Sequence, residues 1–461
     1  MGISPKFFVY SPYFRAIVLP PMHVQRPLEF ISPAYNPLVL RATQLVLPGW
    51  LKSRKAITEI QADNVEVLAE LYQQFQIGKI RFLMAFRHPS TDDPLCMAYL
   101  LSRILPQVAK EQNIPLQYPL HSHFIYDRGI PLWAGVRTSW LYSRLGGIPI
   151  HRGKVDRMSL KVARNLFANG NLPMAVAPEG ATNGHNEIVS SLEPGVAQLG
   201  FWCVEDLVKA GRPEQVFIVP IGIQYSYVDA PWQAVEQILS QLEADSGLEP
   251  QAESLYRRLY QLGEHLLKLM EDFYAQFYPQ MPKITATEFT TRLQALLDVA
   301  LKVAEQYFNI SSSGSLSDRC RRVEQAGWDR IYREDIKNLD ALSPLERGLA
   351  NRIAEEANLR MWHMRLVESF VEVTGDYVLK KHTVERFAET TLLLWDMMTR
   401  IKGGNPFARP RLGKQRVQMT VGEPISVSAR WETYQANRRS AKQSITDLTR
   451  DLQTALEKMI K

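Results

Sequence analysis

Between residues 56 and 230, short apolar runs alternate with segments in which apolar residues recur at helical spacing. The runs show little alternation of apolar and polar residues, as is typical of strands buried on both faces of a sheet. The runs that we expect to be strands are 80–86 (IRFLMAF), 146–150, 172–177 and 217–224. The helices expected between them are 94–110, 131–144, 156–169 and 194–210. This order of elements predicts an α/β domain over 56–230.

A long helical region follows this domain. Between residues 231 and 402, apolar residues recur at helical spacing in several long segments, and we detect no internal repeat. Residues 415–428 then have the pattern of a strand, a turn and a second strand, and a polar helix is expected over 429–461. Because strands return after the helices, we expect the helical block to be inserted into the α/β domain or appended beside it.

The first 55 residues are rich in proline and aromatic side chains and include NPLVLRATQLVLPGWLKSRK. This amphipathic stretch fits a helix that lies in a membrane interface, and it fits equally a helix that packs on its own domain. Pro48 and Gly49 predict a break near its end. No signal peptide is evident, and no apolar run approaches the roughly 18–20 residues that span a bilayer. We therefore expect a soluble or peripheral protein.

Charge and cysteine content narrow the classes of partner. The formal net charge is +6, which suits a phosphate-bearing ligand or an acidic lipid surface. No dense block of Lys and Arg is present, so we expect no nucleic acid partner. The three cysteines lie far apart in the sequence, which argues against a disulfide framework or a zinc site. A reducing compartment such as the cytoplasm is expected.

The stretch RHPSTDDP follows directly on the apolar run that ends at residue 86. An Asp that accepts from one imidazole nitrogen leaves the other nitrogen free to take a proton, so His88 and Asp93 could form a general base with its orienting carboxylate. Free imidazole titrates near about 6.5 and is largely neutral at pH ~7. The alternative is structural, with Asp93 capping a helix that Pro94 begins, beside a solvated histidine.

Three further segments fall at or near the ends of expected strands, where open α/β sheets commonly place their sites. GGIPIHRG joins glycines, which allow close backbone approach, to Arg152, whose forked donors suit a phosphate. APEGATNG places Glu179 and Gly180 at an exposed turn. The third segment is apolar and contains Pro220, which indicates an edge or an interrupted strand. Taken singly, a solvated arginine or an ordinary loop explains each segment equally well.

In order and spacing, the four segments resemble the motif blocks of the glycerolipid acyltransferases of the 1-acylglycerol-3-phosphate acyltransferase type. The matching blocks are HxxxxD at 88–93, a glycine-led block ending in Arg at 146–152, Pro-Glu-Gly at 178–180, and an apolar block with Pro at 219–221. The resemblance covers roughly residues 60–228 and 415–428. It implies a glycerol-3-phosphate acyltransferase-like fold, an α/β domain with a mixed sheet flanked by helices. The family pattern does not explain the helical block 231–402.

The resemblance also implies roles for single residues. His88 would deprotonate an acceptor hydroxyl, which attacks the thioester carbonyl of acyl-CoA or acyl carrier protein, and Asp93 would hold His88. The resemblance implies that the substrate-binding residues are Arg152, Gly147, Glu179 and Gly180. Arg152 would bind an acceptor phosphate. We expect no cofactor beyond the acyl donor, and no metal. We also expect no covalent enzyme intermediate, since a GxSxG motif is absent. The expected acceptor is 1-acylglycerol-3-phosphate or a related glycerolipid, used by a cytoplasmic protein peripherally bound to a membrane surface.

Departures from the family pattern concern the acceptor pocket. The third block usually continues with Thr-Arg, whereas this chain has Ala181-Thr182. The residue before the histidine is usually Asn and is here Arg87, which could restore the lost charge and is therefore added to the substrate-binding residues. A non-phosphorylated alcohol becomes an alternative acceptor. Two other functions stay open, a catalytically weak lipid-binding or scaffold protein built on an acyltransferase domain, and a hydrolase that uses the same histidine.

Two other features each allow a structural and a functional interpretation. His121 and His123 could bind a metal, although no third ligand is evident. The Met and Trp residues of LRMWHMRL (359–366) and LLLWDMM (392–398) fit the core of the helical block, or alternatively the lining of a site for an acyl chain.

Overall fold

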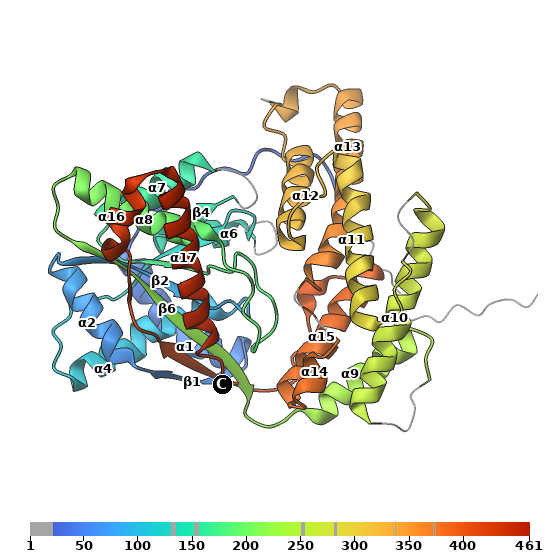
Figure 1. Ribbon diagram of the computed structural model, residues 1–461, viewed down its shortest axis with the longest axis horizontal. Coiled ribbons are helices and arrows are strands. Elements are labelled where there is room, and N and C mark those ends of the chain that lie inside the picture. The colour runs from blue at the N-terminus through green and yellow to red at the C-terminus, as the bar shows by residue number, and fades with distance from the viewer. Residues whose placement is uncertain are drawn as a thin grey trace, which may run out of the picture.

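The computed structural model describes residues 22–130, 135–151, 156–249, 254–280, 284–336, 338–371, 373 and 375–461. The chain forms two parts that lie side by side (Figure 1). Of the described residues, the α/β domain contains 36–230 and those from 415 onward, and the helical domain contains those between 231 and 402, with Val24 in its core. The chain enters the helical domain after strand β6 and returns before strand β7, so the helical domain is an insertion between two strands.

In the described part of the chain, an eight-stranded mixed sheet forms the centre of the α/β domain. Its order is β1-β7-β6-β2-β5-β3-β4, with β8 paired to β6. The strands from β6 to β4 are parallel, whereas β7 is antiparallel to β6 and parallel to β1. The bounds are β1 Ile57–Asp63, β2 Ile80–Phe86, β3 His123–Asp127, β4 Ile148–Ile150, β5 Met174–Val176, β6 Gln215–Tyr227, β7 Gln415–Val421 and β8 Ile425–Ser426. The predicted α/β class with a mixed sheet is confirmed.

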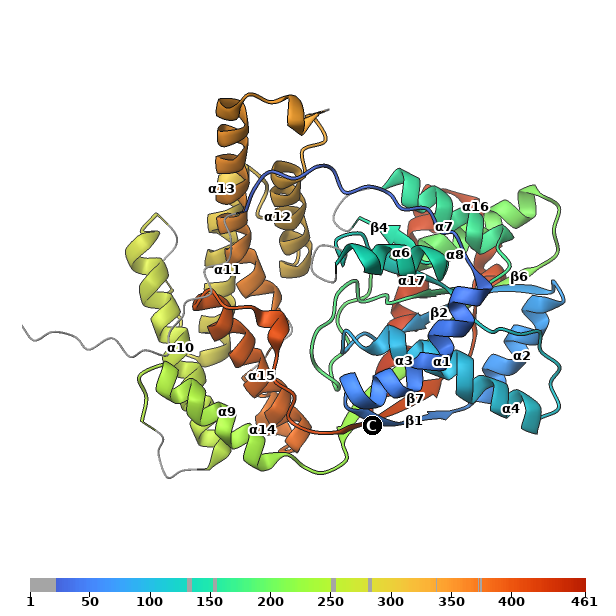
Figure 2. The same ribbon diagram turned by 180° about the vertical axis from the view of Figure 1, so that it is seen from behind.

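Helices cover both faces of this sheet, as the two opposite views of Figures 1 and 2 show. One face carries α1 Pro37–Arg54, α2 Val65–Gln76, α3 Asp93–Tyr99 and α4 Leu105–Glu111, and the other carries α7 Arg157–Asn169, α8 Pro194–Lys209 and α17 Arg438–Glu457. Phe82, Met84 and Phe86 of β2 belong to the core on the first face, and Leu83 and Ala85 belong to the core on the second. Burial on both faces explains why this strand has an uninterrupted apolar sequence.

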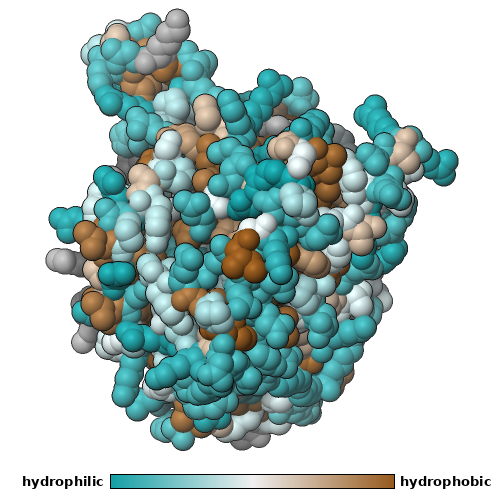
Figure 3. Space-filling view, turned by 90° about the vertical axis from the view of Figure 1, so that its left-hand side faces the viewer, coloured by the Kyte–Doolittle hydropathy of each residue, from teal (hydrophilic) through white to brown (hydrophobic). Residues whose placement is uncertain are grey.

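The remaining short elements complete the α/β domain. Among the described residues they are a π-helical turn at Leu100–Ile104, α6 Val136–Arg144, a 3-10 turn at Ser428–Arg430 and α16 Trp431–Ala436. On the face drawn in Figure 3, hydrophobic side chains lie in small groups among hydrophilic ones. Most of the large apolar side chains are instead in the cores on either side of the sheet.

The structure corrects the expected break in the first helix, because α1 continues through Pro48 and Gly49 to Arg54. Proline has no N–H to donate to the carbonyl four residues earlier, which belongs to Gln44. The side chain of Arg103 donates to this carbonyl at 3.1 Å and so replaces the missing hydrogen bond. Strands β1 and β3 were also not predicted. Their sequences, ITEIQAD and HFIYD, mix polar and apolar residues, and only the first residue of each is buried.

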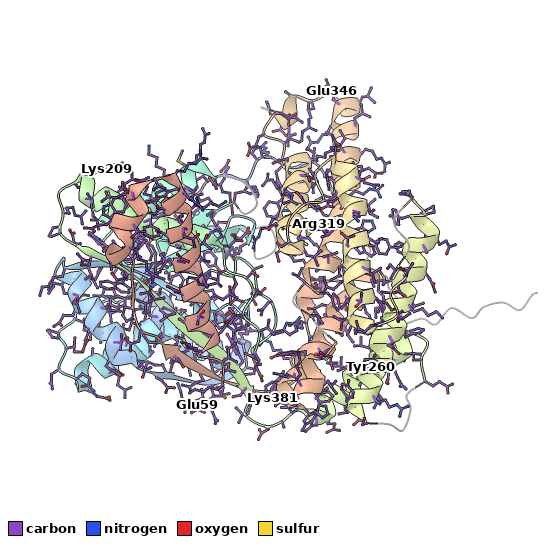
Figure 4. The ribbon with its side chains drawn as sticks, in the orientation of Figure 1. Glu59, Lys209, Tyr260, Arg319, Glu346 and Lys381 are labelled. Carbon is purple, nitrogen blue, oxygen red and sulfur yellow. The ribbon has the colours of Figure 1, made fainter. Side chains whose placement is uncertain are left out.

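The helical domain has a hydrophobic core of its own. Its helices are α9 Trp232–Asp245, α10 Leu255–Phe277, α11 Phe289–Phe308, α12 Leu316–Ile331, α13 Pro344–Glu368, α14 Tyr377–Lys380 and α15 Val384–Ile401. Buried ion pairs also join its helices, and Arg319 of α12 (labelled in Figure 4) donates from Nε to Glu305 of α11 at 2.7 Å. Among the described residues, no helix is both long and apolar enough to cross a bilayer.

The two domains meet at the C-terminal ends of the parallel strands. The ring of Trp328 in α12 packs edge-on against His151, which follows β4, with 5.2 Å between ring centroids. Arg386 of α15 donates to Glu187 at 2.6 Å, and Lys381 donates to the same carboxylate at 3.2 Å from its position between the domains (Figure 4). The inserted helices therefore close over the edge of the sheet at which α/β proteins commonly bind ligands.

Candidate active site

The expected pair of His88 and Asp93 forms at the C-terminal end of β2. His88 lies in the loop after this strand, and Asp93 is the first residue of α3, whose N-cap is Asp92. The Nδ1 atom of His88 lies 3.0 Å from Oδ2 of Asp93, so the imidazole donates to the carboxylate through Nδ1. The side chain of Asp93 is fully buried, whereas that of His88 is 19% exposed. Nδ1 is thus engaged, and Nε2 is the ring nitrogen available to a substrate.

Asp93 is held by two more donors. The backbone N–H of Ser90 donates to Oδ2 at 2.8 Å, and the hydroxyl of Tyr225 donates to Oδ1 at 2.5 Å. Burial raises the pKa of Asp93, and the hydrogen bonds from His88, Tyr225 and Ser90 oppose this rise. Both oxygens are therefore satisfied, and the carboxylate is fixed in the orientation that engages Nδ1.

Tyr225 is a site residue that the sequence interpretation missed. It lies on β6, which pairs with β2 in parallel register. Side chains alternate along a strand, so Tyr225 points to the same face as Ile221 and Ile223, toward α3. The pairing of β6 with β2 was not visible in the sequence, and without it the tyrosine could not be placed beside Asp93.

Glu179, in the turn after β5, binds backbone groups of its own domain. Its Oε1 accepts from the backbone N–H of His88 at 2.7 Å, and its Oε2 accepts from the backbone N–H of Ser190 at 3.0 Å and from Asn183 Nδ2 at 3.1 Å. Burial raises the pKa of Glu179, and the nearby charge of Arg87 opposes this rise. The arrangement indicates that Glu179 positions His88, while its predicted contact with substrate stays a prediction.

Arg87 points into the protein and is 1% exposed. Its Nη2 donates to the carbonyls of Ile188 at 2.6 Å and His185 at 3.3 Å, and its Nη1 donates to the carbonyl of Asn186. Its Nε lies 3.9 Å from Oε1 of Glu179. The guanidinium thus holds the loop of residues 183–190, and its predicted role in substrate binding stays a prediction that this geometry does not favour.

Gly180 adopts a left-handed backbone conformation, with φ of 74°, beside the helical domain. This conformation favours glycine, and a Cβ atom here would lie 2.9 Å from Oε1 of Glu193 and would displace that side chain. Arg321 of α12 forms an ion pair with Glu193 and would lie 3.5 Å from the same Cβ. A cation of the inserted domain therefore reaches the turn at which the family pattern has an arginine.

Of the second block, the structure describes residues 146–151, and Arg152 lies outside the described residues. Gly147 precedes β4, at the end of that strand opposite to residue 151. A Cβ atom on Gly147 would lie 3.0 Å from the carbonyl oxygen of Tyr142 and 3.1 Å from the ring of Tyr126. Close packing between α6 and β3 accounts for this glycine, and its role in substrate binding stays a prediction.

Glu389 of α15 connects the helical domain to this site. Its Oε1 accepts from Nδ2 of Asn186 at 2.7 Å, and its Oε2 accepts from the hydroxyl of Tyr377 at 2.5 Å. Asn186 in turn accepts from the backbone N–H of Tyr225 at 2.7 Å. Burial raises the pKa of Glu389 to about 7. A chain of hydrogen bonds thus runs from a buried carboxyl group of the insertion to the strand residue that holds Asp93.

The alternative metal site at His121 and His123 has a structural explanation. His121 Nε2 donates to the carbonyl of Leu145 at 2.9 Å, and His123 Nδ1 donates to the carbonyl of Gly146 at 2.8 Å. Both bonds tie β3 to the loop before β4. In the described ranges, no group of three or more His, Cys, Asp or Glu side chains is arranged to hold a metal ion.

The position of Arg87 leads to a prediction about stability. Arg87→Met leaves the buried carboxylate of Glu179 and the carbonyls of residues 185, 186 and 188 without their cationic partner, so we expect the free energy of unfolding to fall by at least about 3 kcal/mol. The matched control is Arg164→Met, which breaks partly exposed ion pairs with Asp206 and Glu205 and should cost about 0.2–1 kcal/mol for each pair. Urea denaturation of both variants checks this, and equal losses would contradict the structural role of Arg87.

The raised pKa of Glu389 leads to a prediction about pH. The folded protein binds this proton more tightly than the unfolded chain, in which the pKa is 4.5, so the gain in stability is complete below about pH 4.5 and is lost as the pH rises through about 7. Glu389→Gln stays neutral, so at pH ~8 it should exceed the wild type by up to about 3 kcal/mol, and near pH ~5 by much less. Denaturation at both pH values measures the difference. Glu66→Gln, on the exposed face of α2, is the control, and a gain independent of pH would contradict the prediction.

Comparison of the sequence with protein-family models and with curated proteins identified no relative of this chain. The resemblance to the glycerolipid acyltransferases therefore depends on the four blocks alone. The arguments for a function come from the geometry of His88 and its surroundings.

Proposed function

We propose that this chain is an O-acyltransferase that moves a fatty acyl group from acyl-CoA or acyl carrier protein to a hydroxyl group of a glycerolipid, with 1-acylglycerol-3-phosphate as the default acceptor. The observation that carries the proposal is the pairing of His88 Nδ1 with the buried carboxylate of Asp93 at 3.0 Å. Nε2 of a partly exposed imidazole is then available as a base. The classes of acyl donor and acceptor are inferred from the resemblance of the four motif blocks to those of the glycerolipid acyltransferases.

In the proposed reaction, Nε2 of His88 accepts the proton of the acceptor hydroxyl as its oxygen attacks the thioester carbonyl. A C–O bond forms, and the C–S bond breaks when the tetrahedral intermediate collapses. The proton passes from His88 to the departing thiolate, so the products are an ester and a free thiol. Asp93 stabilises the imidazolium that exists between these two proton transfers, and it keeps Nδ1 protonated throughout.

The surface of α1 supports contact with a membrane, where a lipid acceptor would be found. The helix packs on the α/β domain through Leu40, Leu47 and Leu51. Its opposite side exposes Leu38 (72%) and Leu45 (73%), and Lys52 and Arg54 lie in its last turn. An apolar stripe next to basic residues is typical of helices that bind at the surface of anionic bilayers. The two interpretations of this segment are thus compatible, since one side packs on the domain and the other is available to lipid.

The scaffold alternative is favoured by one observation, the altered acceptor pocket. Ala181-Thr182 replaces the usual Thr-Arg, and Arg87 is engaged with backbone carbonyls. An acceptor phosphate would need Arg152, or Arg321 from the helical domain. A panel with 1-acylglycerol-3-phosphate and with monoacylglycerol as acceptors therefore separates the two acceptor classes, and transfer to neither would favour the scaffold.

The proposed base is tested by His88→Ala. With labelled acyl-CoA or acyl carrier protein and the acceptor panel, we expect transfer by this variant to fall about 10²–10⁴-fold, the usual contribution of a general base. His23→Ala removes an exposed histidine of the same chain and should leave transfer unchanged. Thermal unfolding of both variants shows whether the fold is retained. Wild-type transfer that His88→Ala does not reduce would exclude this mechanism.

Tyr225→Phe tests the support of Asp93. The hydrogen bond from Tyr225 lowers the pKa of Asp93, so its loss should raise that pKa further. The acidic limb of the profile of kcat/KM against pH should therefore move to higher pH, while the rate on the alkaline side stays within about tenfold of the wild type. Steady-state rates measured across the pH range show both parts of the profile. A uniform drop at every pH would indicate a purely structural role.

A further inference from the structure

The helical domain encloses a cavity of about 120 Å³ between α10, α11, α13 and α15. Protein interiors are close-packed, and voids larger than a water molecule are few in any domain. An apolar cavity of about 150 Å³ holds a molecule the size of benzene, so this space is large enough for part of an apolar ligand. A space of this size in the core of a domain indicates a binding site for a ligand.

The lining determines what that ligand can be. It consists of Leu, Val, Met, Ala, Phe, Tyr and Gly residues together with Thr390, and among the described residues it includes no charged side chain. Water requires two to four polar partners and is therefore disfavoured in this space, as are charged ligands. Gly263 and Gly375 also line the cavity, and their lack of side chains leaves room in its walls. An apolar ligand fits this lining.

The cavity is elongated and reaches the surface. Its lining on α10 extends from Tyr256 to Tyr274, which corresponds to about 27 Å along the helix axis at 1.5 Å per residue. Tyr260 belongs to this lining and is also 37% exposed, so the lining meets solvent at this residue, on the lower part of α10 (Figure 4). A long, narrow apolar space with an opening at one side suits a chain that leaves a polar end in water.

We propose that this cavity binds one unbranched hydrocarbon chain, such as that of a fatty acid or a fatty acyl thioester. The site is separate from His88 and Asp93, which lie in the α/β domain at the end of β2. It shares α15 with the contact between the domains, because Leu393 and Met397 line the cavity while Glu389 binds Asn186. The proposal concerns binding and does not require that His88 transfers an acyl group.

The length of the chain provides the first test. Calorimetric titration of the wild-type protein with saturated fatty acids of increasing length, each below its micelle concentration, should show saturable binding. Affinity should rise about threefold to fourfold for each added methylene and level off at the length at which the cavity is full. Decanoate and decanoyl-CoA are titrated separately, and the tighter of the two identifies the source of the chain.

The location of the chain is tested by filling the cavity. A Cβ atom on Gly263 would lie 3.6 Å from the ring of Phe289, an ordinary contact, so Gly263→Leu can place its side chain in the cavity. Leucine also favours a helix more than glycine does, so the variant should retain its thermal stability. We expect decanoate to bind it at least about tenfold more weakly. Gly348→Leu on α13, where a Cβ would meet nothing within 4 Å, is the matched control and should bind as the wild type does.

The outcomes separate this proposal from the acyltransferase. If Gly263→Leu unfolds, Ala300→Leu on α11 fills the same cavity from another helix and replaces it. If His88→Ala still binds decanoate and either filling variant does not, the result supports a chain site separate from His88. This conclusion holds even if the protein acylates no acceptor. Absence of saturable binding by both ligands, or equal binding by Gly263→Leu and Gly348→Leu, would overturn the proposal.

Discussion

The buried carboxylate of Glu179 is the constraint on which the candidate site depends. It lies in the turn after β5 and accepts from the backbone N–H of His88, in the turn after the neighbouring strand β2, at 2.7 Å. Separating the two turns would leave a buried charge without its donors, which costs several kcal/mol. Arg87 holds the same carboxylate and the following loop from the other side. The backbone of His88 is therefore fixed by the turns after two strands, and this position holds the imidazole within hydrogen-bonding distance of Asp93.

The inserted helices extend this constraint beyond the α/β domain. Asn186 joins three parts of the molecule, since it donates to Glu389, accepts from the N–H of Tyr225, and offers its carbonyl to Arg87. Leu393 of α15, one helical turn after Glu389, lines the apolar cavity. Left empty, a cavity of about 120 Å³ would cost about 3 kcal/mol at roughly 24 cal/mol per Å³. A chain bound there would stabilise α15 in the position that holds Asn186, and hence would link occupancy of the helical domain to the order of the site.

The sequence predicted features formed by residues close together along the chain. It missed contacts that depend on which strands and helices lie side by side. The uninterrupted apolar run of β2 identified a strand buried on both faces, and the short distance along the chain from His88 to Asp93 made their meeting foreseeable. Tyr225 and Glu389 act from positions far along the chain, so no spacing in the sequence could place them. Pro48 was misjudged for the same reason, because the donor that compensates for it, Arg103, comes from another helix.

The inward position of Arg87 has a consequence for the acceptor. A substrate phosphate in this site would need a cation that is not already bound to backbone carbonyls. In the described part of the chain, Arg321 approaches Gly180 from α12, with Glu193 as its ion-pair partner. A dianionic phosphate would compete with that carboxylate for the guanidinium, since a guanidinium forms bidentate hydrogen bonds with either group. If an acceptor phosphate is bound by Arg321, then the inserted domain, and not the α/β domain, determines which alcohol the proposed enzyme uses.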